Sequence, residues 1–263
     1  MMLPLVHASI LTFFTMTIFF IVAQLKKDNS IVDIGWGIGL IQIALYTIYK
    51  NPSAGSLQYY ATILILLWGL RLSTHITLRH SRIGEDQRYT AWRTLWQAKG
   101  MVYFYLRSFA QIFMLQGFVM IVVGLPVIAI NSSLHTSLCL PELCGLCLWI
   151  IGFFFEAVAD YQLTMFKKEH SADGKILSSG LWHYSRHPNY FGESLMWWGM
   201  WLLSIHTGFA VITLASPVTI TLLLLYVSGI PLAEKSLASN PAFDKYKSST
   251  SSFIPLPPSQ KKQ

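Results

Sequence analysis

Long apolar runs separated by short polar stretches are the main pattern of this chain. Five runs, at about residues 3–25, 31–49, 56–78, 108–130 and 138–161, are near the length of about 20 residues that a helix needs to cross a bilayer. Two more follow at about 190–205 and 209–232. The pattern predicts an all-α integral membrane protein: a bundle of seven transmembrane helices in a single membrane domain that covers residues 1–263.

Positive charge alternates between the connections of these predicted helices. The connections after the first, third and fifth helices and the C-terminal tail carry 2, 6, 4 and 5 Lys and Arg residues, whereas the other connections carry only Lys50. Because Lys and Arg gather in cytoplasmic loops, this bias predicts an N-terminus outside and a cytoplasmic C-terminus. The net charge of +7 then reflects topology, and no nucleic acid partner is expected.

Composition supports a membrane protein and gives little sign of metal or disulfide chemistry. The chain is 53% hydrophobic and 12% charged, with a mean hydropathy of +0.48, which is too little polar surface for a soluble globule. A multi-pass protein in the lipid bilayer of a bacterial inner membrane or the endoplasmic reticulum is expected. Cys139, Cys144 and Cys147 fall in one apolar segment, with no histidine at ligand spacing beside Cys144 and Cys147. Buried thiols are therefore expected, and no metal.

Ionisable groups within or beside the predicted helices cluster at the predicted cytoplasmic ends of these helices. The predicted cytoplasmic ends carry Asp33, Arg71, His75, Glu156, Asp160, Glu193 and Glu234. Charged side chains within a bilayer usually face a bundle interior or a wet cavity. The sequence therefore predicts a cavity that opens to the cytoplasm. In the same region, Gly35, Gly37 and Gly39 would let a neighbouring helix approach closely.

Helical spacing sorts some of these groups into two stripes. One helical face carries the basic residues Arg71, His75, Arg79 and Arg82. A second stripe contains Glu156, Asp160, Thr164 and Lys167. The first stripe could hold phosphates, and Asp160 could accept hydrogen bonds from ribose hydroxyls. The structural alternative is that Arg71 extends to the interface and Asp160 pairs with a nearby base.

The stretch Gly180–Glu193 leads directly into the sixth apolar run. Pro188 suits the first position of a helix, where its missing N–H costs nothing. A helix N-terminus is expected there, with Arg186 and His187 on its approach, and such a terminus favours anions. Asn189 and Glu193 are four residues apart, so both face one side and could recognise a carboxamide or an adenine edge. Helix capping by Asn189 and an interhelical ion pair of Glu193 are the alternatives.

The extended motif resembles a known membrane family. It reads Gly180-Leu-Trp-x-Tyr-Ser-Arg-His-Pro-Asn-Tyr-Phe-Gly-Glu193, with Glu156-Ala-Val-Ala-Asp160 before it and Gly229-Ile-Pro-Leu-x-Glu234 and the Tyr246 to Pro258 tail after it. Val32-Asp33-Ile-x-Trp-Gly37 and Arg82-x-Gly-Glu-Asp-x-Arg-Tyr89 extend the likeness. The chain is similar to the DUF1295 family, related to steroid 5-alpha-reductases. The resemblance implies a seven-helix bundle whose later helices enclose NADPH, about residues 150–258 with contributions from 71–89.

The resemblance also implies roles for single residues. Asn189 and Glu193 match a pair that holds the nicotinamide carboxamide region, and Asp160 matches the acidic residue near the cofactor ribose. The full set of expected cofactor-binding residues is Arg71, Arg82, Asp160, Lys167, Arg186, His187, Asn189, Glu193 and Tyr246. The substrate-side Glu and Tyr of the steroid enzymes have no clear equivalents here, which puts a 3-oxosteroid in doubt. His75, Tyr184 and Asp33 are the candidate catalytic residues.

These observations favour a membrane oxidoreductase. It would use NADPH to reduce an activated C=C bond of a lipophilic, steroid- or isoprenoid-like small-molecule substrate, with a polar group stabilising the developing enolate. The shorter core Arg186-His-Pro-x-Tyr-x-Gly192 also resembles isoprenylcysteine carboxyl and phospholipid methyltransferases. An S-adenosylmethionine-dependent methyltransferase acting on a lipid or prenylated substrate is therefore the alternative. A non-enzymatic lipid-binding membrane protein is the third.

Overall fold

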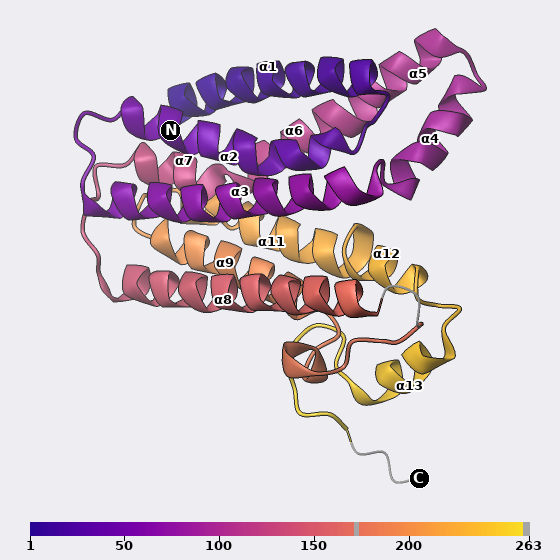
Figure 1. Ribbon diagram of the computed structural model, residues 1–263. Helices are drawn as coiled ribbons and strands as arrows, with labels where there is room; N and C mark the ends of the chain where they lie inside the picture. Colours follow the sequence, from indigo (N-terminus) through magenta and orange to yellow (C-terminus); the bar gives the residue numbers. More distant parts are fainter. Residues whose placement is uncertain (171–173, 260–263) are drawn as a thin grey trace. The chain divides into compact units, whose positions relative to one another are not determined.

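The computed structural model describes residues 1–170 and 174–259, without the side chains of residues 82 and 83. These residues form helices and connections, with no strand among them (Figure 1). Six helical segments in this part of the chain are long and apolar enough to cross a membrane: Met2–Lys26, Ile31–Tyr49, Ser56–Ser81, Met101–Val123, Leu140–Glu169 and Ala210–Lys235. The predicted all-α, multi-pass membrane protein is confirmed.

The predicted count of seven crossings is not confirmed. The helix at the place of the expected sixth crossing, α9, spans Pro188–Leu203 and has 16 residues. A helix of this length is about 24 Å long, which is less than the hydrocarbon core of about 30 Å. The six longer segments therefore meet the length that a crossing needs, and α9 does not meet it.

The described chain divides into two compact units. Unit 1 comprises Met1–Cys139 and Ser204–Ala215, and unit 2 comprises Leu140–Leu203 and Ser216–Gln263. The helices of unit 1 are α1 (Met2–Lys26), α2 (Ile31–Tyr49), α3 (Ser56–Ile83), α4 (Gln87–Gln97), α5 (Met101–Arg107), the π-helical η1 (Ser108–Met114), α6 (Leu115–Val123), α7 (Leu125–Asn131) and α10 (Ala210–Thr213). The expected single domain stays a prediction.

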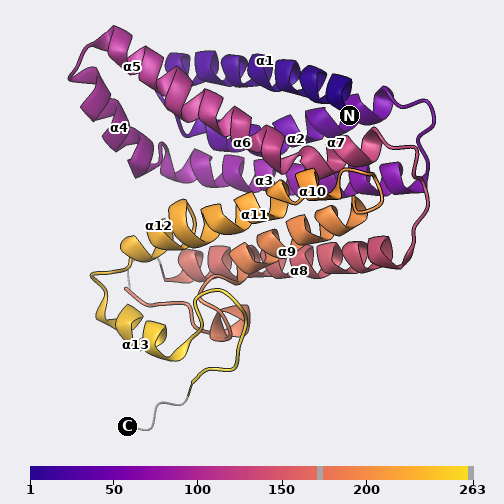
Figure 2. The same ribbon diagram turned by 180° about the vertical axis from the view of Figure 1, so that it is seen from behind.

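In unit 1, α2 and α3 lie side by side (Figures 1 and 2), and glycines of the two helices face each other. A Cβ atom added to Gly69 of α3 would lie 2.8 Å from the carbonyl oxygen of Gly37 of α2. A Cβ atom on Gly35 would come no closer than 3.5 Å, to the Phe19 ring. A Cβ atom on Gly37 itself would clash with the carbonyl oxygen of Gly69, and one on Gly39 would clash with a methionine of α6. Of the three expected glycines, Gly37 and Gly39 therefore require the missing side chain, and Gly35 does not.

The segment that follows α3 turns back onto the start of α2. Gly84 has a φ of 76°, a conformation that glycine adopts at little cost. Asp86 then caps α4, because its side chain accepts the backbone N–H of Arg88 at 2.9 Å. Glu85 accepts the backbone N–H of Asn29 at 2.8 Å and pairs with Arg93 at 2.8 Å. The motif of residues 82–89 therefore anchors α4 to the junction of α1 and α2.

Unit 2 is built on the antiparallel pair α8 (Leu140–Glu169) and α9. A Cβ atom on Gly145 would lie 2.7 Å from the carbonyl oxygen of Gly199, and one on Gly152 would lie 2.6 Å from that of Gly192. The two glycine pairs are two helical turns apart, so the backbones of α8 and α9 are in close contact over these two turns. The remaining elements are the 3-10 turn η2 (Gly180–His183), α11 (Ala215–Leu222), the π-helical η3 (Leu223–Val227), α12 (Ile230–Lys235) and α13 (Pro241–Ser249).

The three cysteines are exposed, whereas the sequence predicted that they would be buried. Cys139, Cys144 and Cys147 form no disulfide in the described part of the chain and are exposed on the surface of the protein. The sequence predicted buried thiols because the segment is apolar. In a membrane protein an apolar residue can instead lie on the lipid-facing side of a helix.

Candidate functional site

The features that the sequence singled out in the Gly180–Glu193 stretch come together in unit 2. The helix begins at Pro188, as predicted. Gly180 has a φ of 62°, and Trp182 of η2 is buried with Ala159 and Leu177. The indole Nε1–H of Trp182 donates to the carbonyl oxygen of Ala159 at 3.1 Å. The tryptophan therefore fixes the stretch onto the last turns of α8.

Asn189 and Asp160 form the first part of the candidate site. The amide Nδ2 of Asn189, on the first turn of α9, donates to the Asp160 carboxylate of α8 at 3.0 Å. The amide oxygen of Asn189 is buried and has no hydrogen-bond partner among the described residues. A buried acceptor without a donor is costly. The close crossing of α8 and α9 thus places a carboxylate and an unsatisfied amide oxygen together.

Arg186 has a role that the sequence did not indicate. Its side chain is buried and donates to Glu234 of α12 at 2.9 Å. It also donates to the carbonyl oxygens of Thr250 and Lys247, at 2.6 and 3.2 Å. The guanidinium expected to meet an anionic cofactor therefore joins α12 and the C-terminal segment to the start of α9.

His187 shares the same carboxylate. Its Nε2 lies 3.2 Å from Glu234, and its ring stacks on Tyr190 with a centroid distance of 5.3 Å. Burial lowers the pKa of His187 and outweighs the opposing effect of Glu234. The ring is therefore neutral at pH 7 and donates its Nε2–H to Glu234.

Tyr246 of α13 also packs on the stretch. Its phenol hydroxyl donates to the carbonyl oxygens of Trp182 and Ser185. Burial raises the pKa of Tyr246, so the hydroxyl keeps its proton. The backbone N–H of Arg186 donates to the carbonyl oxygen of Ser251 at 2.8 Å. These contacts hold the C-terminal segment against the residues that precede α9.

The other expected residues of unit 2 are more open. Glu193 lies one turn after Asn189 on α9 and is half-buried. Lys167 is exposed on α8, seven residues after Asp160. Tyr184 is 46% exposed, so its hydroxyl does not share the enclosed setting of Asn189.

The remaining expected residues belong to unit 1. Arg71 and His75 are half-buried on α3, and the side chain of Arg82 lies outside the described part of the structure. Asp33 lies on the first turn of α2. The residues that the sequence grouped around one cavity therefore belong to two units, and each group is described within its own unit.

Asp33 is part of a hydrogen-bonded chain in unit 1. The Tyr89 hydroxyl donates to Asp33 at 2.8 Å and accepts from the Gln116 amide at 3.1 Å. Gln116 in turn accepts the indole N–H of Trp36 at 2.7 Å. Burial, followed by the nearby Asp33 charge, raises the pKa of Tyr89 well above its usual value. Tyr89 is therefore a protonated phenol held between a carboxylate and an amide.

Sequence reasoning missed two residues of these networks. Tyr89 was part of a quoted motif, and Glu234 was counted among the charged groups, yet neither was assigned a role. A signal was present for both, since Tyr89 ends the motif of residues 82–89 and Glu234 follows the last apolar run. Their partners, Asp33 and Arg186, are 56 and 48 residues away, and such pairings are not visible in local spacing.

Comparison with known proteins places the chain in one family. No curated protein and no solved structure matches it. The family model described as "Protein of unknown function (DUF1295)" matches residues 19–250. This match covers most of the chain, including both networks, so the protein is a member of the DUF1295 family.

Proposed function

We propose that this protein is a membrane oxidoreductase that uses NADPH to reduce an activated C=C bond of a lipophilic substrate. The observation that carries the proposal is the Asn189–Asp160 pair at the start of α9. The Asn189 amide oxygen is buried without a donor in the described chain, and an N–H group of a bound molecule would satisfy it.

The residues of unit 2 fit NADPH in three respects. The carboxamide of the nicotinamide ring has N–H donors suited to the Asn189 oxygen, with Glu193 one turn away. Asp160 can accept hydrogen bonds from ribose hydroxyls. Lys167, exposed two turns further along α8, can reach a phosphate. When bound, NADPH would supply a hydride to the β-carbon of the substrate double bond.

Arg186 and His187 take a different part in this proposal. Both bind Glu234, and Arg186 also binds two tail carbonyl groups. They would shape the wall of the cofactor site and fix the tail that carries Tyr246. Their effect on cofactor affinity would then be indirect.

Asp33 with Tyr89 is the candidate proton donor within unit 1. A neutral phenol hydrogen-bonded to a carboxylate can act as a general acid, and in the proposed reduction the proton goes to the α-carbon. A groove of about 250 Å³ has Ile34, the residue after Asp33, in its lining. The other lining residues are Ile38, Ser73, Thr74, Thr77 and Leu78. Its aliphatic side chains and hydroxyl groups suit a lipophilic molecule that carries a polar group.

The proposed topology follows the charge pattern. We place the N-terminus outside and the C-terminus in the cytoplasm, with α9 as a seventh crossing at which local thinning of the bilayer makes up for the helix length of 16 residues. The membrane would be a bacterial inner membrane or the endoplasmic reticulum.

A methyltransferase is the competing proposal. The core Arg186–Gly192 resembles a motif of lipid methyltransferases as well as that of the reductase-related family, and Asp160 would suit the ribose of S-adenosylmethionine equally well. Titration of purified protein in detergent with NADPH and with S-adenosylmethionine separates the two. Binding of NADPH alone supports the reductase, and binding of S-adenosylmethionine alone supports the methyltransferase. Binding of neither supports a lipid-binding protein without enzymatic activity.

Substitutions locate the cofactor. Asn189→Ala and Asp160→Asn should each weaken NADPH binding by about tenfold or more, since each removes a hydrogen bond to the cofactor. Glu169→Gln is the matched control, because Glu169 is an exposed carboxylate on the same helix. Unchanged affinity in both site variants would exclude this location.

A further inference from the structure

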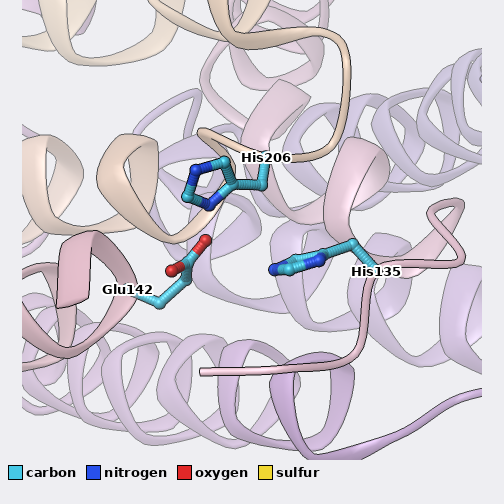
Figure 3. Close-up of side chains that lie close together, drawn as sticks. All are labelled: His135, Glu142 and His206. Atoms are coloured by element: carbon cyan, nitrogen blue, oxygen red, sulfur yellow. The ribbon is translucent and has the colours of Figure 1, made fainter. Parts of the chain in front are cut away.

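Two histidines of unit 1 lie close together on two of its connecting segments. His135 follows α7, and His206 precedes α10. Their ring centroids are 5.4 Å apart with an interplanar angle of 59°, and each offers a ring nitrogen within 4.8 Å of the other's. Figure 3 shows the two rings and also draws Glu142, from the start of α8 in unit 2.

The segment that carries His135 is held in place by α3. Gln58 is fully buried, and its amide donates to the carbonyl oxygens of Ile130, Ser133 and His135 at 3.2, 3.1 and 2.9 Å. The backbone N–H of His135 donates to the Ser133 hydroxyl at 3.0 Å. The His135 backbone is therefore fixed on both sides of its Cα atom.

The segment that carries His206 is fixed as well. The hydroxyl and the backbone N–H of Thr207 both donate to the carbonyl oxygen of Ser204, at 2.7 and 3.1 Å. The Ser204 and Thr213 hydroxyls lie 2.8 Å apart, and Ser204, Thr207 and Thr213 are buried. His206 itself is exposed, so an ordered turn presents a side chain that can move.

We propose that His135 and His206 bind a first-row transition-metal ion such as Zn²⁺ or Ni²⁺. Imidazole nitrogen is a preferred ligand of these ions, whereas Mg²⁺ and Ca²⁺ prefer oxygen. Metal–nitrogen bonds of about 2.0–2.1 Å need the two nitrogens about 3–4 Å apart. Rotation of the exposed His206 side chain closes the difference, and water takes the remaining ligand positions.

The binding would couple distant parts of the chain. The two histidines are separated by 71 residues (206 minus 135), and metal bound to both closes that loop in the folded state only. Metal binding that depends on folding stabilises the fold by mass action. The proposal does not depend on the NADPH site, since all its residues belong to the loops of unit 1.

Calorimetric titration of the full-length protein in detergent tests the site. The protein is purified on a tag without histidine, treated with a chelator and dialysed, then titrated with ZnCl₂ or NiCl₂ at pH 7.5. One site per chain and a rise of the unfolding temperature with Zn²⁺, but not with Mg²⁺, are expected.

Variants decide the outcome. His206→Ala and His135→Ala should each weaken Zn²⁺ binding by about tenfold or more, and His183→Ala, which removes an exposed histidine of unit 2, should leave it unchanged. His206 is exposed, so its replacement tests binding in a folded protein. Equal affinity in the parent protein and His206→Ala, or equal stabilisation by Mg²⁺ and Zn²⁺, would overturn the proposal.

Discussion

The Arg186 guanidinium donates to the Glu234 carboxylate at 2.9 Å, with both side chains largely buried, at 9% and 14% exposure. The same guanidinium binds the carbonyl oxygens of Lys247 and Thr250. Arg186 directly precedes the helix of Asn189, so one side chain connects that helix to α12 and to the tail of Tyr246. Order in the tail and order at the start of α9 therefore depend in part on this ion pair.

Replacing Arg186 by Ala should destabilise unit 2. Removing one partner of a buried pair leaves the other charge uncompensated, and about 3 kcal/mol is expected, the low end of the usual cost because Glu234 keeps some exposure. Thermal unfolding in detergent and limited proteolysis measure the change, with cleavage expected first in the tail. Lys247→Ala is the control: Lys247 is 54% exposed and 3.6 Å from Glu234, and such a pair contributes little. Equal effects of the two substitutions would contradict this role of Arg186.

The stability of the protein should fall as the pH falls from 7.5 to 5.5. Burial lowers the pKa of His187 in the folded state, whereas an unfolded histidine titrates near about 6.5. Between these two pKa values the unfolded state binds more protons than the folded state, so stability is lost on acidification. The unfolding temperature measured against pH checks the slope. His187→Gln should flatten it, and His183→Gln should not; a His187→Gln slope equal to that of the parent protein would contradict the assignment.

The sequence predicted the helices well because apolar length is a local property. Pro188 marked the start of α9 through its fixed φ and missing N–H, and the apolar runs marked the six long segments. The count of seven was not confirmed because α9 ends at Leu203, after 16 residues, which is short for a crossing.

The site was only partly predictable, because side-chain partners far apart in the chain set its chemistry. The spacing of Asn189 and Glu193 was visible, and so was the acidic residue Asp160. The hydrogen bonds of the Arg186 side chain could not be predicted from the sequence, because its partners lie in α12 and in the C-terminal tail. The phenol partner of Asp33 was also hidden, because it lies on α4, beyond the turn at Gly84.

Gly192→Ala should disturb both packing and the cofactor site. A Cβ atom there would lie 2.5 Å from the Gly152 carbonyl oxygen and from the Glu156 backbone nitrogen, so α8 and α9 must move apart. A cost of about 1–3 kcal/mol is expected for such overpacking, together with weaker NADPH binding as Asn189 moves from Asp160. Gly35→Ala is the matched control, since its Cβ atom would make only ordinary contacts, at 3.5 Å. Unchanged stability of Gly192→Ala would show that the crossing is not close-packed.

Tyr89→Phe should slow turnover without changing the affinity for NADPH, because Tyr89 is the candidate proton donor and is no part of the candidate cofactor site. The change removes the hydroxyl that joins Asp33 to Gln116 and leaves both without that partner, which costs about 1–3 kcal/mol. NADPH affinity, measured by titration, should not change, whereas single-turnover NADPH oxidation with a substrate should slow by about 100-fold or more, within the range usual for loss of a general acid. Tyr105→Phe, at a residue that is 43% exposed, controls for loss of a phenol. A Tyr89→Phe protein that is less stable but turns over at the parent rate would assign Tyr89 to structure alone.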